Sequence, residues 1–226
     1  MQELLNEYFP NLMSKLPAFY ESIFETLEMI IRSGVFIFFI GLFLGIVLTV
    51  TKKNGILQNL VIYQILDKLV NFFRSIPFII LLAGLIQLTR LISGTAIGVK
   101  GAIVPLIFGT SPFFARQVET ALAEMNPGLI EAAQAMGSGP IEIIFRVLLK
   151  ECIPGLVRAT TITVINLISL TAMAGAIGAG GLGDFAIRFG HQRNQTDVTY
   201  ATVVVLALLV SAIQIVGNTI SRKSTH

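Results

Sequence analysis

Charge is scarce in this chain of 226 residues: charged residues make up 13% of it, against roughly 25% in ordinary soluble domains. Hydrophobic residues make up 54%, and the mean hydropathy is +0.80. The length allows one or two domains. This composition argues against a water-soluble globular protein.

The residues that several common kinds of functional site require are also absent or rare. Cys152 is the single cysteine, which excludes an intrachain disulfide, and we expect a buried apolar side chain there rather than a reactive thiol. His191 and His226 form no metal-ligand cluster with it, and the net charge of +3 includes no basic run typical of nucleic-acid binding. No lysine follows a glycine, so the phosphate-binding loop of an ATPase is absent. We expect no catalytic residue, metal or cofactor in this chain.

Long apolar runs dominate what is present. A membrane-spanning helix needs about 20 apolar residues. Five segments approach this, at residues 29–51, 58–89, 98–122, 153–177 and 198–220. The second is interrupted by Asp67, Lys68 and Arg74, and Pro77 is expected to kink or start its apolar half. The sequence predicts an all-α polytopic protein with about five transmembrane helices in a lipid bilayer.

The start of the chain has a weaker pattern. Its apolar residues recur at helical spacing, interrupted by Pro10 and Pro17: Leu5, Tyr8, Leu12, Leu16, Phe19, Ile23 and Leu27. Residues 1–21 are therefore predicted to form an amphipathic segment at the membrane interface. Acidic residues, not basic ones, precede the first apolar run, which is not typical of a cleaved signal peptide.

The distribution of basic residues predicts an orientation. With five spans and the N-terminus outside, Lys68 and Arg74 fall within the second segment, and eight basic residues are assigned to the cytoplasmic face: Lys52, Lys53, Arg116, Arg146, Lys150, Arg158, Arg222 and Lys223. Six face outward: Lys15, Arg32, Arg90, Lys100, Arg188 and Arg193. The excess inside favours a cytoplasmic C-terminus and a cytoplasmic loop at residues 123–152.

That loop contains the stretch EAAQAMGSGP, residues 131–140. Asn126-Pro127 can begin a helix and Gly137 can end it. Ala132 and Ala133 permit a close approach to a partner, and we expect Ile130, Ala133 and Met136 to share one apolar face. From the residues alone, either a helix lying on the membrane or a docking helix fits.

Four stretches together resemble a known family. They are FRSIPFIILL, EAAQAMG, PGLVRATTIT and AGAIGAGGLGDF, and they are similar to the permeases of type I binding-protein-dependent ABC importers, above all those for methionine. The second matches the EAA loop of that family at Glu131, Ala132, Ala133 and Gly137. Lys150 stands where the family pattern has proline, and Pro154 is expected to supply the helix break instead.

The resemblance implies a type I transmembrane domain over residues 22–218 of a bacterial cell-membrane protein that imports methionine, both L and D. It implies a second copy of the chain, two copies of a separate ATPase subunit and an external methionine-binding protein as partners. It also assigns ATPase coupling to Glu131, Ala132, Ala133, Met136 and Gly137. The alternatives are a permease for another amino acid, or a self-contained channel or secondary transporter. The last two would be expected to have paired charges deep in the spans or an internal repeat, neither of which is evident in the sequence.

Polar residues in the fourth span are candidates for the substrate path. Thr163, Asn166, Ser169 and Met173 are spaced to lie on one helical face. Such residues at membrane depth face the protein interior or a water-filled path. Hydrogen bonding between helices explains Asn166 and Ser169 equally well, and it explains Thr163 better than a place on the path does.

Two glycine patterns are interpreted as packing features. Gly178 to Gly183 fits G-x-G-x-x-G, but it follows a predicted membrane helix and lacks the acidic residue about 20 positions later. We expect a flexible or closely packed turn there. Gly41-x-x-x-Gly45 predicts close helix packing, either within the subunit or against a copy.

Overall fold

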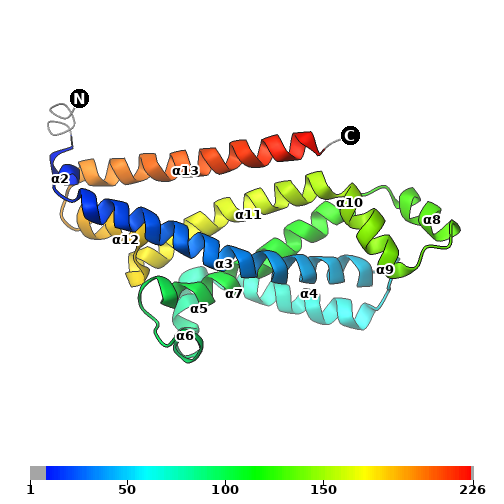
Figure 1. The fold of residues 1–226 in the computed structure, drawn as a ribbon. Helices are drawn as coiled ribbons and strands as arrows, with labels where there is room; N and C mark the ends of the chain where they lie inside the picture. The colour runs from blue at the N-terminus through cyan, green and yellow to red at the C-terminus, as the bar shows by residue number, and fades with distance from the viewer. Residues whose placement is uncertain (1–8, 225–226) are drawn as a thin grey trace. The chain divides into compact units, whose positions relative to one another are not determined.

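The computed structural model describes residues 9–224, and these form helices and connecting segments with no strand among them (Figure 1). The elements are α2 (Pro10–Met13), α3 (Leu16–Thr51), α4 (Leu60–Ser75), α5 (Phe78–Gly84), α6 (Ile86–Ser93), α7 (Gly98–Ala123), α8 (Pro127–Ala135), α9 (Pro140–Glu142), η1 (Ile143–Leu148), α10 (Leu149–Glu151), α11 (Ile153–Ala174), η2 (Gly175–Ala179), α12 (Gly181–Phe185), η3 (Ala186–His191) and α13 (Thr196–Lys223). The all-α prediction is confirmed.

Four of the predicted spans coincide with long apolar helices. α3, α7, α11 and α13 are each long and apolar enough to cross a membrane. The bounds of α7 and α13 lie close to the predicted ranges, whereas α3 begins at Leu16, well before the predicted residue 29. Its N-terminal part contains Glu21, Glu25 and Glu28, so this extension has no continuous apolar run.

The second predicted span is built from three helices. α4 ends at Ser75, Ile76 is extended at φ −83° and ψ 124°, and Pro77 precedes α5. A residue before proline is pushed towards extended backbone, which explains this break. A second break at Leu85 separates α5 from α6. That this segment crosses the bilayer remains a prediction.

One compact unit contains the described residues up to Val35 together with Pro77–Phe108 and Val164–Ile213. Its buried core contains Phe19, Leu182, Phe185 and Val198, with Leu12 and Ile23 packed against them. In the same unit, the Asp197 carboxylate accepts hydrogen bonds from the backbone N–H groups of Asn11 and Leu12, at 2.9 and 3.2 Å.

The start of the chain therefore packs on protein in its described part, and α3 shows no boundary at residue 21. The predicted positions Leu5 and Tyr8 lie outside the described residues. The location of this segment at a membrane interface stays a prediction.

A second unit contains Phe36–Ile76, Gly109–Thr163 and the described residues from Gln214 onward. Leu48 on α3, Val70 on α4 and Ala115 on α7 are buried together at its centre. A Cβ atom added to Gly41 would lie 2.6 Å from the Phe114 ring, and one added to Gly45 would lie 2.6 Å from Val118. The predicted glycine pair thus brings α3 against α7 within the subunit.

Candidate functional site

The helix α8 begins and ends where the sequence predicts. The Asn126 side chain accepts a hydrogen bond of 2.9 Å from the Gly128 N–H, and Pro127 occupies the first turn. At the other end Gly137 adopts φ +83°. The Gly137 N–H donates to the Gln134 carbonyl, and the Ser138 N–H donates to the Ala133 carbonyl. These paired bonds satisfy the last carbonyls of the helix and stop it.

α8 buries a single small side chain fully and leaves most of its length exposed. Ala133 is buried at 2% exposure and Ile130 is half-buried, whereas Glu131, Ala132 and Gln134 are exposed. Met136 is 79% exposed. Met136 follows the last residue of α8, and that it shares a face with Ile130 and Ala133 stays a prediction.

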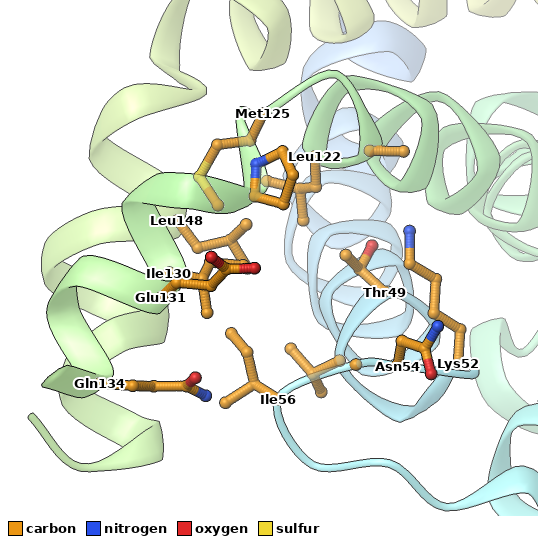
Figure 2. A pocket seen from close by; sticks show the side chains of 14 residues that line it. Thr49, Lys52, Asn54, Ile56, Leu122, Met125, Ile130, Glu131, Gln134 and Leu148 are labelled. Carbon is orange, nitrogen blue, oxygen red and sulfur yellow. The ribbon is translucent and has the colours of Figure 1, made fainter.

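A pocket of about 360 Å³ lies beside α8 in the second unit (Figure 2). Its apolar lining includes Ile56, Leu122, Ile130 and Leu148. From α8 the Glu131 carboxylate points into this pocket, and Lys52 and Thr49 project into it from the opposite side. Among the described residues, Glu131 forms no ion pair, so its charge is available to a partner.

The segment that connects α8 to α11 contains a helix break close to Pro154, the residue that was expected to cause it. The π-helix η1 leads into α10, and the helix is interrupted at Cys152, where φ is −91° and ψ is 6°. α11 starts at Ile153, so Pro154 lies in its first turn. Pro154 has no N–H for the Lys150 carbonyl, which favours a break at this place.

Cys152 lies at this break and is buried at 6% exposure. Burial raises the pKa of its thiol, and the nearby carboxylates of Glu151 and Glu124 raise it further. A thiol with a raised pKa holds little nucleophilic thiolate at neutral pH. The structure agrees with the predicted buried, unreactive side chain.

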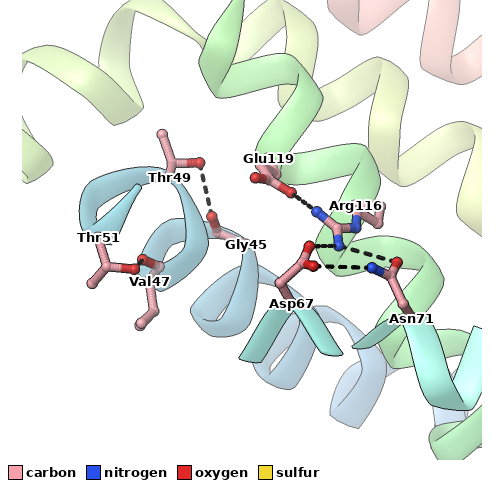
Figure 3. A network of polar contacts seen from close by, with 8 residues as sticks. All are labelled: Gly45, Val47, Thr49, Thr51, Asp67, Asn71, Arg116 and Glu119. Atoms are coloured by element: carbon pink, nitrogen blue, oxygen red, sulfur yellow. Dashed lines mark hydrogen bonds and ion pairs between the residues drawn. The ribbon is translucent and has the colours of Figure 1, made fainter. Parts of the chain in front are cut away.

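A polar network joins α4 to α7 in the same unit (Figure 3). Arg116 donates to Asp67, to Asn71 at 3.1 Å and to Glu119 at 2.5 Å. Asn71 in turn donates to Asp67 at 3.2 Å. Asp67 and Arg116 are separated by 49 positions of sequence, and their pairing was not predicted from the sequence.

The spacing of these residues was the available signal. Asp67 and Asn71 lie four residues apart, and Arg116 and Glu119 lie three apart, so each helix presents two polar groups on one face. Which two faces meet depends on how the helices pack, and that was not evident from the spacing.

The predicted substrate-path residues all lie on α11, in different environments. Thr163 is buried, and its hydroxyl donates 2.8 Å to the Ala159 carbonyl of its own helix. Asn166 is half-buried, Ser169 is exposed, and Met173 is 38% exposed. In the first unit, a partly exposed face of α11 therefore contains Asn166, Ser169 and Met173. The Thr163 hydroxyl is instead bonded within its own helix.

The glycine-rich turn is packed tightly against α3 in the first unit. Gly178, Gly180 and Gly181 have positive φ. The Gly181 N–H donates 2.6 Å to the Glu25 carboxylate, and the Leu182 N–H donates 2.8 Å to the Thr26 hydroxyl. Side chains of α3 thus occupy the backbone donors that a dinucleotide fingerprint would offer to phosphate. The interpretation as a closely packed turn is confirmed.

Known proteins share this sequence and arrangement. The chain is 46% identical to a probable D-methionine transport system permease protein of Vibrio cholerae over 89% of this chain and 90% of that one. It is 43% identical to a methionine import system permease protein of Bacillus subtilis over 96% and 97% of the two chains. A chain of the MetNI methionine ABC transporter, solved in an inward-facing conformation, superimposes with a TM-score of 0.92 at 46% identity, covering 94% of this chain and 99% of that one.

The family model for the inner membrane component of binding-protein-dependent transport systems matches residues 37–224. This match covers most of the chain, including α8 and all or part of each of the four long helices. This multi-pass membrane protein therefore belongs to the family of binding-protein-dependent transport system inner membrane components.

Proposed function

We propose that this chain is the permease subunit of an ATP-driven importer that carries methionine across the cell membrane. The observation that carries the proposal is the 46% identity to a D-methionine permease over nine-tenths of both chains. The relatives' names support methionine in both stereochemical forms as the transported solute. A permease for another amino acid is the alternative substrate assignment, and measured uptake of each candidate separates the two.

A separate ATPase chain supplies the energy in this proposal. No lysine follows a glycine in the sequence, so a phosphate-binding loop of the ATPase type is missing from this chain. Two ATPase subunits would pair with two copies of this permease, and an external binding protein would deliver methionine. The solved complex that this chain superimposes on is an ABC transporter, which supports such an assembly.

α8 is the proposed docking element for that ATPase. It is a short helix with defined ends, in which Ala133 is buried, Ile130 is half-buried and the remaining residues are exposed. Glu131 carries the one charge of the helix, and its carboxylate points into an open pocket. In this role α8 faces the cytoplasm, which places the N-terminus outside and the C-terminus inside, in agreement with the distribution of basic residues.

Charge reversal at α8 tests the proposal. Glu131→Lys is expected to abolish or weaken co-purification of the ATPase, because a cation replaces the one carboxylate of the docking helix. The variant should reach the membrane at wild-type abundance, since the side chain is exposed. Glu151→Lys, at another exposed glutamate outside α8, is the matched control and should retain the ATPase. Normal co-purification and uptake by Glu131→Lys would contradict the docking role.

A further inference from the structure

α8 has few routes by which a force on it can reach the long helices. Ala133 is its one buried residue, and a pocket separates part of the helix from the ends of α3 and α7. Three residues, Glu124 to Asn126, connect α7 directly to α8. The covalent connection through α7 is therefore the stiffest route out of α8 on its N-terminal side.

Arg116 lies on α7 two turns before that connection and joins it to α4. Its guanidinium serves acceptors on both helices, namely Asp67 and Asn71 of α4 and Glu119 of α7 itself. The Arg116 and Glu119 side chains are 18% and 13% exposed, so water competes weakly for these bonds. The Asp67 side chain is 30% exposed and receives donors from Arg116 and Asn71.

Apolar packing between these helices does not by itself fix their register. Leu48, Val70 and Ala115 hold the helices of the unit together, but contacts of this kind have little directionality. A planar guanidinium with three acceptors fixes both the rotation and the sliding of α7 against α4, because its donors have fixed directions.

We propose that Arg116 is a positioning residue for energy coupling: through Asp67 it locks α7 to α4, so that movement of α8 is transmitted to α4 instead of being lost in slippage between helices. The inference rests on the proposed function, since it requires an ATPase that acts on α8. A purely structural network would change stability and assembly. A positioning network changes how much methionine moves for each ATP hydrolysed.

The experiment measures methionine uptake and ATP hydrolysis in the same proteoliposomes, containing the permease, its ATPase and external binding protein. Arg116→Lys keeps the positive charge but loses the planar guanidinium with its several donors. Asp67→Asn keeps the shape of the side chain but loses the negative charge. Each is expected to lower the uptake-to-hydrolysis ratio about threefold or more while the complex stays assembled. Arg146→Gln is the control, because Arg146 pairs with Glu142 inside one helical segment and links no helices.

A covalent replacement of the network separates positioning from folding. In a Cys152→Ala background, Asp67→Cys with Arg116→Cys is expected to be poorly coupled, and a short bifunctional thiol reagent joining the two positions should restore the ratio. Wild-type ratios in both single variants would overturn the inference while leaving the proposed function intact. A joined double variant that stays uncoupled would also overturn it. A wild-type complex without ATP-dependent methionine uptake would overturn the proposed function first, and this inference with it.

Discussion

At the scale of single residues, Gly181 at the start of α12 is constrained by the side chains of α3 that pack against it. Gly181 has φ +75°, and a Cβ atom added there would lie 2.7 Å from the Thr26 hydroxyl and 2.8 Å from the Met29 methyl group. Its N–H donates to Glu25. The residue thus carries two constraints, one on backbone conformation and one on space.

Gly181→Ala is expected to destabilise the protein more than a positive φ alone would. The conformational strain of a non-glycine residue there is about 1–3 kcal/mol, and the clash with Thr26 adds to it. Thermal unfolding of the detergent-solubilised protein measures the effect as a lower Tm. Gly94→Ala is the matched control, because Gly94 has φ +73° and open space around its Cβ position. Equal decreases in Tm for the two variants would show that the close contact between α3 and position 181 does not add to the destabilisation.

At the scale of elements, the break between α10 and α11 sets where the long helix begins. Pro154 lies two residues after the interruption at Cys152, and Lys150 lies two residues before it. Alanine at position 154 would supply an N–H for the Lys150 carbonyl and would remove the proline ring that opposes a continuous helix.

Pro154→Ala is therefore expected to join α10 to α11 and to slow methionine uptake, because the segment after α8 could no longer turn at this point. Lys150→Pro should transport at close to the wild-type rate, since the helix already ends beside it. Uptake into cells expressing each variant at equal abundance provides the measurement. A silent Pro154→Ala with an inactive Lys150→Pro would mean that the determinant of the break lies at position 150.

Elements whose boundaries depend on local chemistry were predictable from the sequence. The Asn126 cap, the left-handed Gly137 and the extended residue before Pro77 each act within a few positions, so the ends of α8 and the start of α5 were readable. The N-terminal extension of α3 contains three glutamates, which obscure the apolar pattern, and the break at Leu85 was not predicted. The pairing of Asp67 with Arg116 depends on which helix faces meet, and spacing within one helix gives no information on that.

At the scale of the whole molecule, much of the apolar surface has no cover within one chain. Large side chains along α13, among them Tyr200, Val204, Leu208 and Ile215, are more than half exposed. Monomeric soluble proteins rarely expose contiguous apolar surface of this kind, whereas lipid or a second copy of the chain would cover it. On α11 the exposed positions include polar Ser169, which lipid would not favour. The exposed polar side chain on α11, in contrast to the apolar surface of α13, favours contact of this face of α11 with water.

The substrate path is therefore predicted to follow Asn166, Ser169 and Met173 at the junction of two copies. In a Cys152→Ala background, single cysteines at these positions should react with water-soluble thiol reagents faster than cysteines replacing Ile165 and Ile168, of which Ile168 is 3% exposed. Ser169→Trp should block methionine uptake while the complex still assembles, because an indole fills the path without touching α8. Equal labelling of both sets would assign the polar side chains to hydrogen bonds between helices, since a lined path requires a difference between the two faces of α11.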